Sequence, residues 1–153
     1  MTASTASPRA LVDTNIVVYA YDLDEPRKHD RAIELLKTLS DDGRLVFSAQ
    51  VFNEFCSAMM KPKRKRPLRP DEIAVLLREL QATGDIVPIT ASMSFRALDA
   101  MSRHGLSFWD ALIWAAAADN GIEVIYTEDF QDGRNIEGVR FINSFLTDAA
   151  PGS

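Results

Sequence analysis

Short apolar segments alternate with amphipathic segments along nearly the whole chain, and this alternation restricts the fold more than any other feature. The segments between the apolar ones have apolar residues at the spacing of an α-helix. Strands that alternate with helices are joined by right-handed crossovers into a parallel sheet that is covered on both faces. We therefore expect an α/β fold, a three-layer α/β/α sandwich with a mainly parallel central sheet. The candidate strands are Arg9–Val12, Leu45–Phe47, Asp85–Ile89, Glu123–Tyr126 and Val139–Ile142.

The helices are indicated by apolar residues at helical spacing. Positions 32, 35, 36 and 39 share one helical face, and positions 73, 76, 77 and 80 repeat the spacing after the helix start Pro70-Asp71-Glu72. A further helix is expected to end at Gly105. The segment Ser107–Asp119 is apolar almost all round, which predicts a helix buried on most sides. The β-branched and aromatic residues of Ile16–Tyr19 favour a strand, but this apolar segment also fits a buried helix.

The 153 residues are enough for one domain with a sizeable core. We assign residues 9–146 to this domain, residues 1–8 to a flexible N-terminal tail and residues 147–153 to a flexible C-terminal tail. The longest uncharged apolar run, Ala111–Ala118, is too short to cross a bilayer, so we expect no membrane partner. Cys56 is the only cysteine, which excludes an internal disulfide and suits the reducing cytoplasm.

Positive charge is concentrated in one segment of an acidic chain. The formal net charge is −5, yet the stretch 61–70 holds six of the 17 basic residues. Without these six, 11 basic residues face 22 acidic ones, a net charge of −11. Such a run is either a solvated linker or an electrostatic contact for phosphates. Its basic residues are Lys61, Lys63, Arg64, Lys65, Arg66 and Arg69.

Acidic residues stand where predicted strands end and at the inner edges of predicted helices. Asp13 follows the first strand, and Asp129 comes shortly after the fourth. Glu54 lies at the border of an apolar helical face, and Asp110 lies in the first turn of the most apolar helix. Ligands of open α/β sheets bind beyond the carboxyl ends of the strands. We therefore expect the four carboxylates to converge on one cleft.

Each of these acids also has an ordinary structural explanation. Asp13 fits a helix N-cap, and Glu54 could reach from its border position into water. Ser107-x-x-Asp110 matches a capping box. Asp129 fits a turn before the Asp-Gly pair at 132–133. Only the joint placement of the four favours a shared site.

A cluster of carboxylates needs a counter-charge. Two charges about 5 Å apart repel by roughly 3 kcal/mol at an effective dielectric constant of about 20. A divalent cation removes this repulsion. The predicted ligands are all carboxylate oxygens, with no histidine near a motif and no cysteine pair, which favours Mg²⁺ or Mn²⁺ over zinc.

Four short motifs together resemble the PIN-domain ribonucleases, and most of all the VapC-type toxins of bacterial toxin–antitoxin pairs. They are DTN at 13–15, NEF with Glu54, SFWDALI with Asp110 and YTED with Asp129. SFWDALI followed by YTEDFQDG is the specific part, whereas DTN alone is weak. The resemblance extends from about Ala10 to Phe145 and includes the closing GRNIEGVRFINSF.

The resemblance implies a PIN-like fold and a metal-dependent endoribonuclease that hydrolyses RNA phosphodiester bonds. Asp13 and Asp110 match the family's principal ligands for Mg²⁺, for which Mn²⁺ could substitute, and Glu54 and Asp129 match its other two acids. The resemblance also implies a homodimer and inhibition by a VapB-type antitoxin. The positions that match supporting polar residues of the family are Thr14, Asn15 and Thr127.

Within this reading, Glu54 or Asp129 would orient or deprotonate the attacking water, and the basic stretch 61–70 would hold flanking phosphates. Glu128 is left out of the site, because the family's fourth acid aligns two residues after the threonine.

Two alternatives belong to other functional classes. A PIN-like module could bind RNA or protein without cutting it. A receiver-type signalling domain also places acids around Mg²⁺, but it needs a phospho-accepting Asp at the end of a central strand. The candidate strand DIVPIT ends in Thr90 instead.

Overall fold

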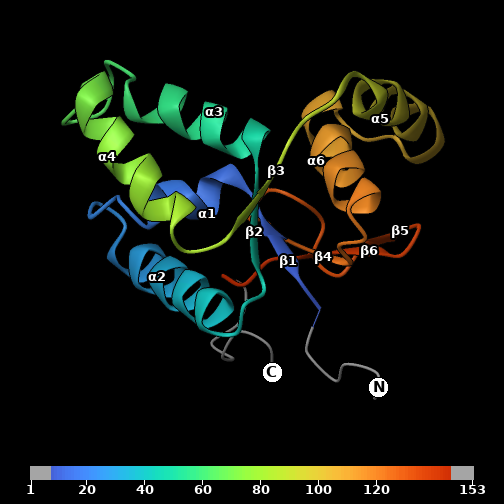
Figure 1. Cartoon of the computed structure of the whole chain (residues 1–153), viewed down its shortest axis with the longest axis horizontal. Coiled ribbons are helices and arrows are strands. Elements are labelled where there is room, and N and C mark those ends of the chain that lie inside the picture. Colours follow the sequence, from blue (N-terminus) through green and yellow to red (C-terminus); the bar gives the residue numbers. More distant parts are fainter. Residues whose placement is uncertain (1–7, 146–153) are drawn as a thin grey trace.

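A single six-stranded sheet runs through the part of the chain that the structure describes (Figure 1). The computed structural model describes residues 8–145. The strand order is β3-β2-β1-β4-β6-β5, and all neighbours are parallel except β5 and β6. The bounds are β1 Ala10–Val12, β2 Leu45–Ser48, β3 Asp85–Val87, β4 Val124–Tyr126, β5 Asn135–Ile136 and β6 Val139–Ile142.

Helices lie on both sides of this sheet (Figure 1). On one side are α1 (Thr14–Tyr19), α2 (Pro26–Asp41), α3 (Ala49–Met59) and α4 (Pro70–Gln81). On the other side α5 (Ala91–His104) and α6 (Phe108–Asp119) pack against each other, and α6 contacts β4 and β6. This arrangement confirms the predicted three-layer α/β/α sandwich with a mainly parallel sheet.

The predicted tails fall almost wholly outside the described residues. Residues 1–7 and 147–153 lie there, and so does Leu146, the last residue assigned to the domain. Pro8 is described, and its carbonyl accepts a hydrogen bond from Arg44 Nε at 2.7 Å. The division into tails and domain therefore stays a prediction.

All five predicted strands are present, with small differences at their ends. β3 stops at Val87 rather than at residue 89, since Pro88 has no N–H for the ladder. The prediction missed β5, which forms an antiparallel hairpin with β6. The hairpin turns at Glu137 and Gly138, with φ of 50° and 92°. Glu-Gly lacks the Asn or Asp that usually marks such a turn, so the hairpin has almost no local signal.

The ambiguous segment Ile16–Tyr19 is helical and belongs to α1. Ile16 and Val17 are fully buried, so packing against neighbouring helices outweighs their preference for strands. The helix begins directly after Asp13, whose carboxylate caps it. Helix α1 therefore follows β1 with only Asp13 between them, which places Asp13 at the carboxyl edge of the sheet.

Helix α6 is buried on most sides, as predicted. Its residues from Ala111 to Ala117 are all buried, and Trp114 is 0% exposed with its Nε1 donating to the Ile136 carbonyl at 3.0 Å. Gly105 ends the preceding helix α5 in a left-handed conformation with φ of 68°. No helix among residues 8–145 is long and apolar enough to cross a membrane.

Candidate active site

The candidate site lies at the carboxyl edge of the sheet, beside the central strands β1 and β4. From β1 the chain continues to β2 and β3 on one side, whereas β4, β6 and β5 lie on the other. Such a reversal of strand order opens a crevice at the carboxyl ends, where ligands bind in α/β folds. Asp13 and Thr127 directly follow the two strands, and Asp13 N donates to the Tyr126 carbonyl at 2.9 Å.

Asp13 is both a helix cap and a member of the site. Its Oδ1 accepts a hydrogen bond from Thr14 N at 2.7 Å, and its Oδ2 accepts one from Thr127 Oγ1 at 2.8 Å. The pKa of Asp13 is raised from 3.8 to about 6. Burial is the main cause, the two hydrogen bonds oppose it, and the nearby charges of Glu54 and Asp110 add to it. A carboxylate in such a place is stabilised when a cation enters.

The other three acids come from three separate elements. Glu54 lies on α3 and accepts a hydrogen bond from Gln50 Nε2 at 2.8 Å. Asp110 lies in the first turn of α6, where its backbone N donates to Ser107 Oγ at 3.2 Å. Asp129 follows β4 and accepts from Asn15 Nδ2 at 3.0 Å.

All four acids line one pocket of about 430 Å³. Thr14 and Asn15 line it too. Thr127 does not line it, but its hydroxyl donates to Asp13, which does. The structure therefore brings together the seven residues that the sequence analysis assigned to the site. The role of each in catalysis remains a prediction.

Glu128, the neighbour of Asp129, faces a different set of partners. Its carboxylate forms an ion pair with Lys28 Nζ at 2.7 Å and accepts a hydrogen bond from the Tyr19 hydroxyl at 2.8 Å. Glu128 thus has a structural partner of its own. Its omission from the predicted site agrees with this geometry.

Six residues that the sequence reasoning did not place in the site also line the pocket, and three of them bear on its chemistry: Gln50, Trp109 and Lys61. Gln50 stands four residues before Glu54, a spacing that puts both on one helical face and that the sequence analysis could have used. Trp109 precedes Asp110 directly. Lys61 was counted only as part of the basic stretch.

The donor set of the pocket fits a divalent cation of the hard type. Besides the carboxylates, the oxygens Thr14 Oγ1 and Asn15 Oδ1 are buried and lack a hydrogen-bond partner within the described part of the chain. Oxygen-only surroundings are those that Mg²⁺ and Mn²⁺ prefer. Across residues 8–145, however, no three acidic, histidine or cysteine side chains already stand close enough to hold an ion. The carboxylates would have to move together around it.

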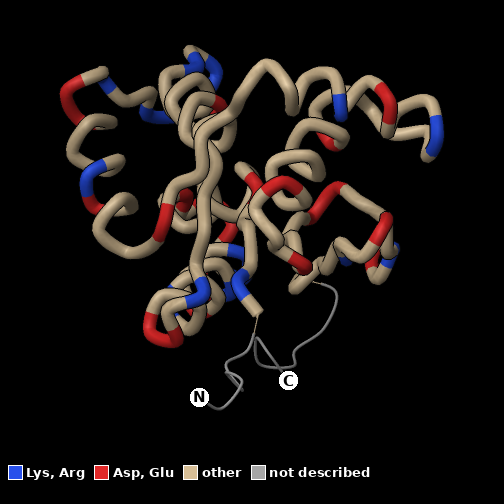
Figure 2. The backbone as a smooth tube through the Cα atoms, turned by 45° about the vertical axis from the view of Figure 1, so that its right-hand side comes forward, with Lys and Arg blue, Asp and Glu red and all other residues tan. Residues whose placement is uncertain are grey.

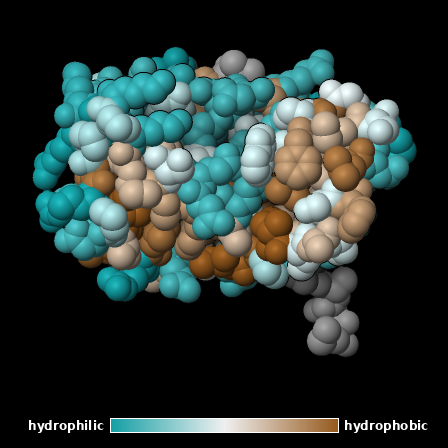
Figure 3. Space-filling model, turned by 90° about the horizontal axis from the view of Figure 1, so that it is seen from above, coloured by the Kyte–Doolittle hydropathy of each residue, from teal (hydrophilic) through white to brown (hydrophobic). Residues whose placement is uncertain are grey.

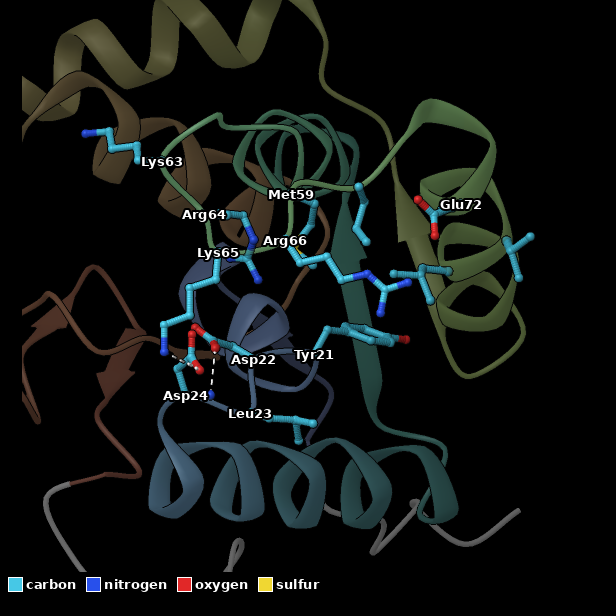
Figure 4. Close-up of a pocket in the computed structure, with 13 residues that line it drawn as sticks. Tyr21, Asp22, Leu23, Asp24, Met59, Lys63, Arg64, Lys65, Arg66 and Glu72 are labelled. Atoms are coloured by element: carbon cyan, nitrogen blue, oxygen red, sulfur yellow. Dashed lines mark hydrogen bonds and ion pairs between the residues drawn. The ribbon is translucent and has the colours of Figure 1, made fainter.

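Residues 61–69 of the basic stretch form a loop without helix or strand between α3 and α4, as the backbone tube in Figure 2 shows. The side chains of its cations have different surroundings. Lys61 lines the acidic pocket. Lys63 to Arg66 line a second pocket of about 750 Å³ between the loop, Tyr21 and α4 (Figure 4). Lys65 pairs with Asp24 at 3.5 Å, and Arg69 pairs with Asp71 at the start of α4 at 3.1 Å. The six cations therefore do not act as one patch.

Comparison with known proteins identifies the family. Residues 10–132 match the PIN domain. Ribonuclease VapC13 of Mycobacterium tuberculosis is 32% identical over 120 residues, which are 78% of this chain and 88% of that protein. A VapC ribonuclease of Mycobacterium bovis matches equally well. The chain belongs to the PIN-domain family, in its VapC branch. The resemblance drawn from the four motifs is thereby confirmed.

Solved structures share the fold of this PIN domain at low sequence identity. A toxin–antitoxin complex from Klebsiella pneumoniae superimposes with a TM-score of 0.62 at 22% identity, covering 88% of this chain and 97% of that one. VapBC2 from Rickettsia felis gives 0.61 at 18% identity, with coverage of 86% and 96%. VapC20 of Mycobacterium tuberculosis gives 0.60 at 21% identity, with coverage of 86% and 98%. At these identities the likeness concerns the fold alone.

Proposed function

We propose that this PIN domain is a metal-dependent endoribonuclease and acts as the toxin of a VapBC-type toxin–antitoxin pair. One observation carries the proposal: four carboxylates from four separate segments line a single pocket at the carboxyl edge of the sheet. The relatives in its branch are named ribonucleases, which gives the acidic pocket its expected chemistry, hydrolysis of RNA phosphodiester bonds.

The ion that we propose is Mg²⁺, for which Mn²⁺ can substitute, held by Asp13 and Asp110 together with Glu54 and Asp129. Such a cation supplies Lewis acidity toward a phosphate and the counter-charge that the acids need. Thr127 and Asn15 orient two of these carboxylates through the hydrogen bonds described above. Glu54 or Asp129 then accepts the proton of the attacking water.

Charge explains how an acidic pocket could receive RNA. Without a cation the four carboxylates would repel the phosphate backbone, and Lys61 stands among them as a positive contact. Arg64 and Arg66 of the loop extend toward the second pocket (Figure 4). We propose that they, together with Lys61, Lys63 and Lys65, hold phosphates that flank the cleavage point, whereas Arg69 pairs with Asp71.

The proposed function also includes protein partners and a cellular location. The neighbour from Klebsiella pneumoniae is a toxin–antitoxin complex, and we extend to this chain inhibition by a VapB-type antitoxin, homodimerisation and a cytoplasmic location. Exposed apolar side chains support a protein partner: Phe95 is 75% and Leu98 is 53% exposed on α5. Seen from above, apolar residues gather on the side of α5 and α6, and further apolar residues lie across the rest of this face (Figure 3).

A second candidate function is a PIN module that binds RNA or protein without cutting it. The observation in its favour is that no three acids within residues 8–145 already stand close enough to hold an ion. The receiver-type alternative has less support, because β3 with its DIVPIT segment lies at an edge of the sheet.

The deciding experiment is cleavage of a mixed RNA pool by the purified protein with Mg²⁺, with Mn²⁺ and with EDTA. Asp13→Asn, prepared in the same way, is the matched variant. We expect metal-dependent cutting that this variant loses. Equal cutting by both proteins would reveal a contaminant, and binding without cutting would favour the silent module.

A further inference from the structure

Trp109 is a large aromatic side chain left open beside the acidic pocket. It is 59% exposed, it lines the pocket, and the next residue is Asp110. Trp114, five positions later on the same helix, is 0% exposed. Exposing an indole forgoes the free energy that its burial would contribute. The position of Trp109 therefore suggests a partner that covers it.

Its neighbours hold Trp109 in place. The ring packs edge-to-face against Phe108, with centroids 5.2 Å apart and planes at 76°. The Trp109 carbonyl accepts a hydrogen bond from Gln50 Nε2 at 3.4 Å, which joins α3 to the start of α6. The hydrogen bond fixes the backbone at Trp109, and the contact with Phe108 restricts the ring, which lowers the entropic cost of covering its flat apolar face.

Gln50 gives a second sign that a ligand completes this end of the pocket. It is only 7% exposed, and its Nε2 donates both to Glu54 and to the Trp109 carbonyl. Both partners are acceptors, so this end must be the amide nitrogen. Gln50 Oε1 is then a buried acceptor, and no donor in the described part of the chain reaches it. An acceptor left without a donor is costly.

The charge of the pocket favours a neutral contact at this point. The four carboxylates repel phosphate, whereas stacking of a base on an aromatic ring does not depend on net charge. Sequence-selective proteins bind RNA mostly where bases are unpaired and can stack on aromatic side chains. An exposed ring one residue from a catalytic acid suits a base close to the cleaved bond.

We propose that Trp109 stacks on an unpaired base next to the scissile phosphate and that Gln50 Oε1 accepts a hydrogen bond from the same nucleoside. This inference rests on the proposed ribonuclease function and assigns two further residues of the pocket to the nucleoside beside the cleaved bond. Trp109 is then a residue for substrate binding and specificity.

Fluorescence tests the contact directly, because the chain has only two tryptophans and Trp114 is buried. The probe is a pool of unstructured RNA 12-mers, added to Asp13→Asn protein so that it is not cut. We expect the pool to quench the emission, and the same pool hybridised to its complement to quench far less. Adding Trp109→Phe to this protein should abolish the quenching, since only Trp114 then emits.

Kinetics with the otherwise unchanged protein separate stacking from folding. Stacking is worth about 1–3 kcal/mol per base, which corresponds to about 5- to 150-fold in affinity. Trp109→Ala should raise KM by that factor and leave kcat within about threefold, while Trp109→Phe restores KM. Gln50→Ala should raise KM as well.

The outcomes distinguish this inference from the function on which it rests. Metal-dependent cutting without quenching would overturn the role of Trp109 and leave the ribonuclease intact. Quenching without cutting would support the contact and refute the ribonuclease. If Trp109→Ala dissociates a dimer without RNA and leaves KM unchanged, the ring is covered by a second copy and the inference is wrong.

Discussion

Asp13 combines a structural role and a chemical role in one carboxylate. It caps α1 while its neighbours Glu54 and Asp110 and its own burial raise its pKa to about 6. The sequence analysis treated the cap and the site as competing explanations. The structure satisfies both, because the two carboxylate oxygens have different partners.

The raised pKa of Asp13 predicts how the metal-free protein responds to pH. Between about pH 4 and pH 6 the folded protein retains a proton that the unfolded chain has lost, so stability falls as pH rises through this window. Above pH 6 Asp13 is ionised in both states, and the free energy of unfolding has fallen by its full amount, at most about 3 kcal/mol. Asp13→Asn should therefore raise the free energy of unfolding in EDTA at pH 7.5, by about 1–3 kcal/mol.

Urea unfolding of both proteins between pH 4 and pH 8 measures this effect. The difference between them should shrink toward zero as the pH approaches 4. A variant that is less stable than the wild type at pH 7.5 would contradict the prediction.

Asp129 and Glu128 form a matched pair for testing the site, because they are adjacent in sequence and face different partners. Asp129→Asn should lower kcat by about 100-fold or more, since it removes a proposed metal ligand or proton acceptor. Glu128→Gln should stay within about threefold of the wild type. Initial cleavage rates at saturating Mg²⁺ decide between them, and equal losses would refute the choice of Asp129.

At the scale of elements, the basic loop 61–69 combines two kinds of surroundings. Its cations face two pockets, and Lys65 and Arg69 have acidic partners. The free contacts for phosphate are therefore fewer than the charge count suggests. Arg64 and Arg66, which extend into the second pocket in Figure 4, are the better candidates there.

Replacing Arg64, Lys65 and Arg66 together by alanine should weaken RNA binding and flatten its salt dependence. Each lost phosphate contact lowers the slope of log K against log salt by about 0.7 for single strands. Binding titrations of Asp13→Asn protein at several salt concentrations give this slope. Arg69→Ala is the control, and we expect it to leave the slope unchanged. An unchanged slope in the triple variant would make the loop a linker.

Elements were predicted best where one strong pattern covers them. The apolar face of α2 and the all-round apolar character of α6 gave the right helices, and Gly105 gave the right end for α5. α1 stayed ambiguous because six residues are too few for a period to show. β5 was missed because two residues and a Glu-Gly turn carry almost no signal.

At the scale of the whole molecule, the acidic pocket should link metal binding to stability. An ion that binds only the folded state adds about 2.7 kcal/mol at a concentration of 100 Kd. For a chain of this length this corresponds to a rise in Tm of about 5–10 °C. Thermal unfolding with and without Mg²⁺ measures it, with Asp110→Asn as the comparison. Equal rises in both proteins would place the ion outside the site.

The sequence alone determined the layers of the fold, the parallel sheet, the family and the four acids. Periodicity and short motifs can be recognised within short stretches of the chain, so these features did not require the tertiary structure. Only the tertiary structure decided what those acids face. It gave Glu128 partners of its own in Lys28 and Tyr19, divided the basic loop between two pockets, and brought Gln50 to the carbonyl of Trp109. These relations join residues far apart in the chain, and they depend on crossovers and packing that local patterns do not encode.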